Sequence, residues 1–356
     1  MGNGAPLRPD DGPLYDRLAG LELEIDGYTL ERRSLAVSSG FTRVTTTVAL
    51  SGAGMTGRGE DVGYEAADHD AYPQDLDIAG GRTLDDLSAR LDGLELFPAA
   101  PLRPADRYYR RWAFESAALD LALRQAGRSL GEYLGLPYRA VRFVVSTRLE
   151  IGPWLAIDPA LEFKLDPTSE WTGERIRTAA RTGRVRALDF KGYYEGTVVD
   201  APPDPRLYRT VAEAFPDAIL EDPAWNDETA AALAGHEGRI AWDAPIHGVD
   251  DLGRMPVAPR WLNVKPSRFG TLRRLCDTVD ACRERSIACF GGGQFELGVG
   301  RAQIQCLASL FWADAPNDVA PTAYNEPEPQ PGVPGSPLIP TEGQQGFGFR
   351  FAANGR

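Results

Sequence analysis

A repeat of short apolar segments and amphipathic stretches limits the folds that this 356-residue chain can adopt. Eight segments have the length and apolar content of buried strands. They are 141–146, 160–165, 185–190, 217–222, 239–244, 261–266, 286–291 and a weaker one at 317–324. The helical stretches between them predict parallel strands joined by crossover helices. Eight such repeats favour a closed (β/α) barrel of the TIM type, and an open doubly wound sheet is the alternative.

Five successive segments each carry a charged residue, and these positions follow one another at intervals of 22 to 32 residues. They are Lys164, Asp189, Glu221, Asp243 and Lys265. Because the carboxyl ends of barrel strands meet at one mouth, we expect three carboxylates with a lysine on each side. Carboxylates pressed together repel one another and need a counter-cation. A hard divalent ion such as Mg²⁺ would supply it, and a salt-bridge network without a metal is the alternative.

The first third of the chain has a different pattern. Residues 21–36 and 41–50 alternate between apolar and polar side chains, which predicts paired strands, and residues 111–136 have helical apolar spacing. We therefore divide the chain into an α+β domain at 1–138, the barrel at 139–325, and a proline-rich connector with a tail at 326–356 that returns to the first domain.

The segment GAGMTG at 52–57 matches the GxGxxG pattern of dinucleotide-binding proteins. No apolar helix follows it to direct its N-terminus at a pyrophosphate, so a nucleotide-dependent oxidoreductase is a minor alternative. We interpret the segment as a flexible loop able to cover the barrel mouth, with His69 exposed in the same lid.

The overall charge and the absence of targeting features exclude several classes of protein. Lys and Arg number 38 against 51 Asp and Glu, a net charge of −13 that disfavours nucleic-acid binding. There is no run of 18 apolar residues, so we expect no membrane span, and the N-terminus lacks the apolar core of a signal peptide. The four cysteines form no CxxC pair, so we expect a cytoplasmic protein with reduced thiols; a homo-oligomer is compatible with this sequence.

Several segments resemble the enolase superfamily, in the subgroup of muconate lactonizing enzymes, o-succinylbenzoate synthases and dipeptide epimerases. The segments resembling its fourth-, fifth- and sixth-strand motifs are LEDPAW, AWDAPIHGVDDL and NVKPSRFGTL. The likeness extends to GRGEDVGY and to FESAALDLALRQAGRSLGEYLGL, so that it covers most of the chain. It implies a capping domain over a modified barrel of seven to eight strands.

The resemblance also implies an activity and assigns roles to the charged ring. Mg²⁺ would be bound by Asp189, Glu221 and Asp243, while Lys164 and Lys265 act as the acid/base pair. Such an enzyme abstracts the α-proton of a small-molecule carboxylate through an enediolate. We expect the cation and partial desolvation to lower the lysine pKa values from about 10.4.

The outcome of this chemistry is left open by the sequence. It would be racemisation or epimerisation, with β-elimination by a dehydratase or an o-succinylbenzoate synthase-like lyase as the alternative. A non-catalytic relative that binds a metal or a small acid is the alternative from another class.

Two positions depart from the family pattern. Glu162 stands where the second strand usually has its first Lys, and Lys191 stands where the third strand usually has Asn. An alternative alignment makes residues 189–191 the second strand, with Lys191 as the base.

Four charged side chains near the strand ends are candidates for binding the distal part of a substrate. They are Arg148, Lys191, Arg268 and Glu296. An arginine can pair with a second substrate carboxylate, and a solvated surface position is the alternative for both arginines.

Overall fold

The computed structural model describes residues 12–37, 40–195, 200–326 and 328–352. Our interpretation of the N-terminus depends on residues 1–11, which lie outside the described residues, as do Pro327 of the connector and the last four residues of the tail. No helix within the described ranges combines the length and the apolar character that a bilayer crossing requires.

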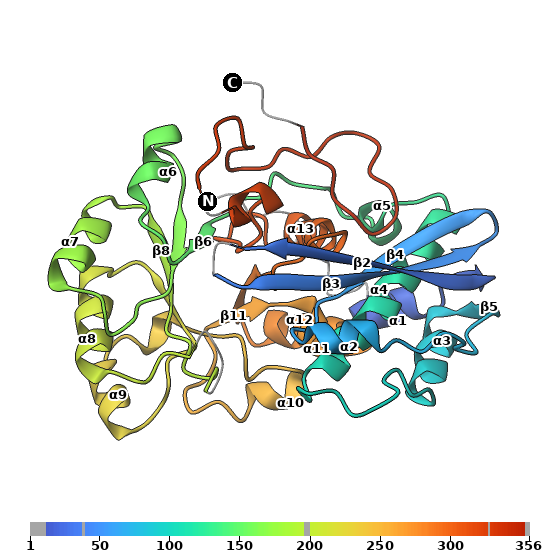
Figure 1. Ribbon diagram of the computed structural model, residues 1–356, viewed down its shortest axis with the longest axis horizontal. Coiled ribbons are helices and arrows are strands. Elements are labelled where there is room, and N and C mark those ends of the chain that lie inside the picture. The colour runs from blue at the N-terminus through green and yellow to red at the C-terminus, as the bar shows by residue number, and fades with distance from the viewer. Residues whose placement is uncertain (1–11, 38–39, 196–199, 327, 353–356) are drawn as a thin grey trace.

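The N-terminal part is built around an antiparallel sheet of three strands, drawn in blue in Figure 1. Its strands are β2 (Gly27–Ala36), β3 (Thr42–Gly52) and β4 (Met55–Asp61). A second antiparallel pair consists of β1 (Glu22–Ile25) and β5 (Gly80–Thr83). The helices of this part are α1 (Leu14–Ala19), α2 (Ala66–Asp70), α3 (Leu84–Asp92), α4 (Asp106–Gln125) and α5 (Leu130–Leu134). Helix α4 packs against β3 and β4, because the apolar stripe predicted for it is buried there.

The GAGMTG segment forms a tight hairpin between β3 and β4, so our interpretation of it as a flexible loop is wrong. Gly52 pairs with Met55, and Ala53 and Gly54 have φ values of 49° and 74°, which a two-residue turn of this kind requires. A Cβ on Gly57 would lie 2.2 Å from a backbone nitrogen of α4. These glycines thus serve a turn and a close strand–helix contact, and the nucleotide-binding alternative loses its motif.

His69 is buried, which contradicts the exposed position that we expected. Its side chain is 5% exposed, with one ring nitrogen 2.9 Å from the Thr46 hydroxyl and the other 3.0 Å from the Gly63 carbonyl oxygen. Burial lowers the pKa of the imidazole. His69 therefore belongs to the core of the N-terminal part.

The C-terminal part confirms the predicted barrel-type architecture. Seven parallel strands lie side by side in the order of the sequence, from β6 to β12. They are β6 (Val145–Thr147), β7 (Phe163–Leu165), β8 (Val185–Asp189), β9 (Ile219–Glu221), β10 (Ile240–Trp242), β11 (Trp261–Val264) and β12 (Ala288–Gly291). A doubly wound sheet reverses its strand order at a switch point, and this sheet does not, so the open-sheet alternative is wrong.

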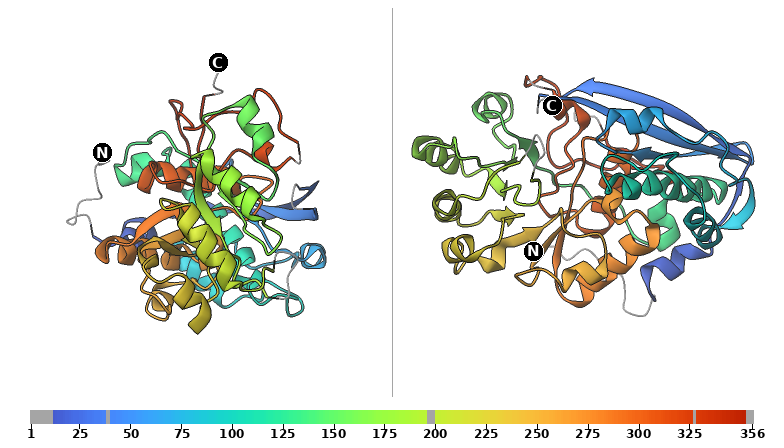
Figure 2. Two further views of the ribbon diagram at one scale, coloured as in Figure 1. Left: turned by 90° about the vertical axis from the view of Figure 1, so that its left-hand side faces the viewer. Right: turned by 60° about the horizontal axis from the view of Figure 1, so that its bottom comes forward.

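Helices follow most strands and lie on the outer side of the curled sheet, as the green and yellow ribbons in Figure 2 show. The α-helices of this part are α6 (Gly152–Ile157), α7 (Gly173–Arg181), α8 (Pro205–Ala214), α9 (Asp227–Ala232), α10 (Val249–Leu252), α11 (Pro266–Phe269), α12 (Leu272–Glu284) and α13 (Gly300–Phe311). Two 3₁₀ turns accompany them, η2 (Glu237–Arg239) and η3 (Thr322–Asn325).

The weak eighth segment forms single bridges in place of a strand. Asn317 bridges to Phe143, just before β6, and Asp318 bridges to Gly292, just after β12, both in parallel. The Asn317 side chain adds a hydrogen bond on each side. Residues 317–318 thus connect the two edges of the seven-stranded sheet and bring Asp318 to the mouth of the barrel.

Buried charged side chains join the N-terminal sheet to the loop after β12. Glu60, on β4, accepts the backbone N–H groups of Leu297, Gly298 and Gly300 at 2.7 to 2.9 Å. Arg43, on β3, donates to carbonyl oxygens of the same loop. The N-terminal sheet is therefore held against one end of the barrel by buried, fully hydrogen-bonded contacts.

Candidate active site

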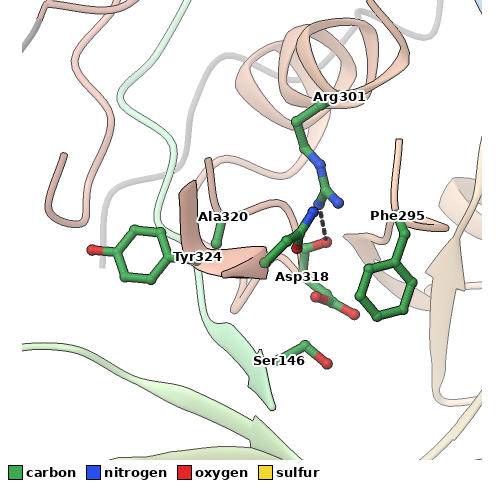
Figure 3. A pocket seen from close by; sticks show the side chains of 8 residues that line it. Ser146, Phe295, Arg301, Asp318, Ala320 and Tyr324 are labelled. Carbon is green, nitrogen blue, oxygen red and sulfur yellow. Dashed lines mark hydrogen bonds between the residues drawn. The ribbon is translucent and has the colours of Figure 1, made fainter. Parts of the chain in front are cut away.

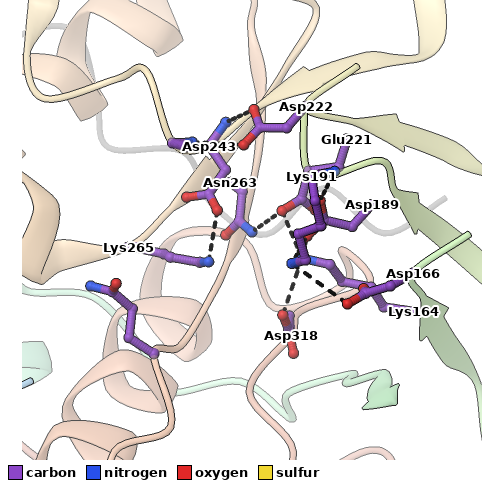
Figure 4. A network of polar contacts seen from close by, with 12 residues as sticks. Lys164, Asp166, Asp189, Lys191, Glu221, Asp222, Asp243, Asn263, Lys265 and Asp318 are labelled. Atoms are coloured by element: carbon purple, nitrogen blue, oxygen red, sulfur yellow. Dashed lines mark hydrogen bonds and ion pairs between the residues drawn. The ribbon is translucent and has the colours of Figure 1, made fainter. Parts of the chain in front are cut away.

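The five charged residues at the strand ends come together in the interior of the barrel mouth (Figure 4). Each is at most 6% exposed. Lys164 lies within β7, Asp189 and Glu221 end β8 and β9, and Asp243 and Lys265 follow β10 and β11 directly. Because neighbouring parallel strands place their ends side by side, the five residues lie around the mouth in the same order as along the chain.

Lys164 forms ion pairs with three carboxylates at once. Its Nζ lies 2.6 Å from Glu221 Oε1, 3.2 Å from Asp189 Oδ2 and 3.2 Å from Asp318 Oδ2. Burial alone would lower the pKa of this amine, but the negative charges, that of Glu221 first, outweigh it and raise the pKa well above its ordinary value. The lowered pKa that we expected beside a divalent cation stays a prediction, because these ion pairs involve only groups of the chain.

Asp243 is held on both oxygens by cations from the next strand–helix unit. Arg268 Nε lies 2.8 Å from Oδ1, and Lys265 Nζ lies 2.7 Å from Oδ2. The Tyr194 hydroxyl donates to Oδ2 at 3.0 Å. Burial would raise the pKa of this carboxyl, but Arg268 and Lys265 hold it far below its usual range. The charged form of Asp243 is thus fully paired.

Neighbouring polar side chains position this ring. Asp222 accepts the backbone N–H groups of Asp243 and Ala244, both at 2.8 Å, and so fixes the loop after β10. Asn263, two residues before Lys265 on the same face of β11, donates to Glu221 Oε1 at 2.9 Å. The other oxygen of Glu221, Oε2, is buried and has no hydrogen-bond partner among the described residues.

The two departures from the family pattern have different surroundings. Glu162 pairs with Arg142 and Arg186, each at 2.6 Å, and forms no ion pair with Lys164 among the described residues. Lys191 binds Asp189, on the strand after β7. Residues 189–191 therefore lie at the end of the third barrel strand, and the alternative alignment that made them the second strand is wrong.

The remaining candidates lie at different distances from the ring. Arg268 binds Asp243 directly and is 6% exposed, so the solvated surface position is wrong for it. Arg148 is half-buried and pairs with Asp166 at 2.9 Å. Glu296 is buried and pairs with Arg301 at 3.1 Å in the loop after β12.

A small pocket opens beside the ring, between the first and last barrel strands (Figure 3). Arg301 and Asp318 are among the residues that line it, and Asp318 also contacts Lys164. The labelled side chains around it are Ser146, Phe295, Arg301, Asp318, Ala320 and Tyr324. The pocket thus continues from Lys164 toward the loop after β12.

Sequence reasoning missed three polar residues of the site. Asn263 shares the face of Lys265 at a spacing of two, which an alternation argument could have found. Asp222 directly follows Glu221, but its φ of 44° turns it toward the next loop, which no sequence pattern indicates. Asp318 lies in the weak eighth segment, where a charged residue beside a doubtful strand carried little signal.

The carboxylates have the donor chemistry of a magnesium site, although cations of the chain already engage them. Among the residues that the structure describes, no three His, Cys, Asp or Glu side chains are grouped so as to hold a metal ion as they stand. Asp189, Glu221 and Asp243 nevertheless supply hard oxygen ligands from three neighbouring strands, and Glu221 Oε2 is a buried oxygen without a partner among described atoms. The donor set therefore fits a divalent ion once the ion-paired side chains move.

Solved structures of enolase-superfamily members share this fold. A dipeptide epimerase from Methylococcus capsulatus, solved with Mg and the dipeptide L-Arg-D-Lys, has a TM-score of 0.66 and 18% identity over 92% of this chain and 99% of that one. An enolase-superfamily member of unknown function from Enterococcus faecalis has a TM-score of 0.59 and 20% identity, covering 93% and 92%. Muconate lactonizing enzyme from Pseudomonas putida has a TM-score of 0.61 and 17% identity, covering 92% and 97%. The capped-barrel fold predicted from the resemblance is confirmed.

Sequence comparison adds one curated relative and the family of the chain. O-succinylbenzoate synthase from Bacillus subtilis is 36% identical over 83 residues, which span 23% of this chain and only 22% of that enzyme. The relatives named by structure and by sequence are thus enolase-superfamily isomerases and lyases, as the resemblance implied. Residues 16–133 and 137–326 match the N-terminal and C-terminal domains described as a domain of unknown function (DUF8230). The chain belongs to this DUF8230 family.

Proposed function

We propose that the chain catalyses Mg²⁺-dependent abstraction of the α-proton of a small-molecule carboxylate, leading to racemisation or epimerisation. The observation that carries this proposal is the pair of buried lysines, Lys164 and Lys265, on either side of three strand-end carboxylates. Two amines that face one carbon from opposite sides can remove a proton from one face and return one to the other. The likeness to a dipeptide epimerase fold supports an outcome of this kind.

Asp189, Glu221 and Asp243 would hold the magnesium ion in this proposal. When bound, such an ion offsets the negative charge that develops on the substrate carboxylate as its α-proton leaves. The unpartnered Glu221 Oε2 and the three hard oxygen donors support this assignment.

Carboxylates of the chain pair with both lysines. Because its pKa is raised, Lys164 is charged at neutral pH and is ready to donate a proton to a carbanion. To act as a base, it must first lose contact with at least one of its carboxylate partners. Lys265, paired with Asp243 in the interior, is the amine available on the opposite side.

Elimination is the second candidate reaction, because the matched curated relative is o-succinylbenzoate synthase. Here the same α-carbanion would expel a leaving group in place of regaining a proton. The pocket beside Asp318 and Arg301 would receive the distal part of the substrate in either reaction. A cytoplasmic location is also part of this proposal, and a homo-oligomer is compatible with it.

The test is α-deuterium uptake in D₂O with Mg²⁺ across a library of carboxylic acids and dipeptides, followed by proton NMR and mass spectrometry. We expect uptake by the wild type and its loss in Lys164→Ala and Lys265→Ala. Glu162→Gln, which alters a carboxylate that pairs with Arg142 and Arg186, is the matched control and should retain uptake. If the wild type binds a ligand tightly but takes up no deuterium, a non-catalytic binding protein is favoured. If product forms but the recovered substrate contains no α-deuterium, elimination is favoured.

A further inference from the structure

Lys191 binds both oxygens of Asp189, one of the proposed metal ligands. Its backbone N–H donates to Oδ1 at 3.1 Å, and its ammonium donates to Oδ2. Asp189 is fully buried, and Lys164 also contacts Oδ2. Lys191 therefore contacts both oxygens of this buried carboxylate and shares Oδ2 with Lys164, and a buried anion needs such compensation.

The backbone is bent to make this contact. Lys191 has a φ of 55°, in the left-handed region that residues other than glycine adopt at a cost. Gly192, the next residue, packs so closely on Ala224 that a Cβ would lie 2.1 Å from its nitrogen. The turn after β8 thus packs tightly against Ala224, with the Lys191 ammonium on Asp189.

The surrounding charges reinforce this placement. Asp166 lies 3.9 Å from the Lys191 ammonium, and its carboxylate also pairs with Arg148. The Lys191 ammonium thus lies between two carboxylates, those of Asp166 and Asp189. A divalent ion bound to Asp189 would lie beside this ammonium, and their repulsion must be relieved by movement of Lys191.

We propose that Lys191 is a tethered counter-cation that holds Asp189 when no divalent ion is bound and competes with Mg²⁺ for that carboxylate. The carboxylates of the barrel mouth therefore assemble without a metal, and Mg²⁺ binds weakly until Lys191 leaves Asp189. This inference rests on the proposed function only in taking Asp189 as a magnesium ligand.

The experiment is a titration of the metal-free, full-length protein with MgCl₂ by isothermal calorimetry, without substrate. Lys191→Asn removes the ammonium and suits the left-handed backbone, since asparagine adopts it readily. We expect this variant to bind Mg²⁺ about tenfold or more tightly than the wild type, because a nearby like charge is removed. Lys191→Arg keeps the cation and should bind as weakly as the wild type. Arg186 lies on the same strand, β8, and pairs with Glu162. Arg186→Asn removes this cation and should leave the Mg²⁺ affinity unchanged.

Thermal unfolding gives a second readout that does not depend on the calorimetry. In EDTA we expect the wild type to keep its melting temperature, whereas Lys191→Asn melts lower and regains stability when MgCl₂ is added. Equal Mg²⁺ affinities of wild type and Lys191→Asn, no Mg²⁺ binding by any variant, or a wild type that loses stability in EDTA would each overturn the inference. The melting temperature of the wild type in EDTA tests the inference even if Lys191→Asn does not fold. Deuterium exchange does not enter these assays, so a failure of the proposed reaction is seen separately.

Discussion

Asp106 offers a quantitative test of the electrostatics of the N-terminal part. It is the first residue of α4, is 1% exposed and lies near the charged Asp61. Burial first, and the charge of Asp61 second, raise the pKa of this carboxyl from 3.8 to about 7. We predict that Asp106→Asn stabilises the protein at neutral pH and that its effect depends on pH.

The sign and size follow from proton linkage. Below about pH 4 both the folded and the unfolded state hold the proton of Asp106, so the raised pKa has no effect on stability. Between about pH 4 and 7 only the folded state holds it, and the free energy of unfolding falls as pH rises. At 1.36 kcal/mol per pH unit, the interval from 3.8 to about 7 sets an upper limit of about 4 kcal/mol. The positive N-terminus of α4 favours the anion and offsets part of this, so we expect about 2 kcal/mol.

The assay is urea unfolding of the wild type and Asp106→Asn at about pH 4.5, 6 and 8. These values span the pH range over which the folded and unfolded states differ in the protonation of Asp106. The stability of Asp106→Asn relative to the wild type should rise over this range by about 2 kcal/mol and then level off. Asp75→Asn, at an exposed position, is the control and should show no such rise. A constant difference between Asp106→Asn and wild type at all three pH values would refute the reasoning.

Two further substitutions test the packing that positions the site. Asp222→Asn places an amide NH2 against one of the backbone N–H groups of Asp243 and Ala244. Guanidinium unfolding should therefore show that the free energy of unfolding falls by about 1–3 kcal/mol, and deuterium uptake should slow. Unchanged stability and uptake would contradict the role of Asp222. Gly57→Ala directs a methyl group to within 2.4 Å of two backbone atoms of α4 and should cost about 3 kcal/mol or more. Gly54→Ala, with open space around a φ of 74°, should cost only about 1–2 kcal/mol; equal losses for the two glycines would argue against the close contact.

The architecture could be predicted because local patterns carry it. Buried parallel strands produce apolar runs, and crossover helices produce a 3.6-residue apolar spacing, so seven strand positions were found within a few residues. The prediction of an eighth strand failed because residues 317–318 connect the sheet edges through single bridges and one side chain, which leave no periodic pattern in the sequence. The GAGMTG segment was misinterpreted because a glycine pattern does not distinguish a phosphate-binding turn from a hairpin packed on a helix.

The chemistry of the site was only partly predictable. Charged residues at the ends of apolar runs indicated the five positions of the ring, since buried charges need a functional or structural reason. Which cation binds which carboxylate was not accessible: Arg268 reaches Asp243 from a short helix, and Lys191 turns back on Asp189. The raised pKa of Lys164 depends on its carboxylate partners, which no pattern in the sequence indicates.

The sequence alone determined that parallel strands would end in three acids with a lysine on each side, because strand and helix periods are patterns of local residue order. The tertiary structure alone decided how those charges are paired. Ion pairs form between side chains tens or hundreds of residues apart, as with Lys164 and Asp318, and their energies depend on burial and on distances of a few ångströms. Neither quantity is present in the order of residues along the chain.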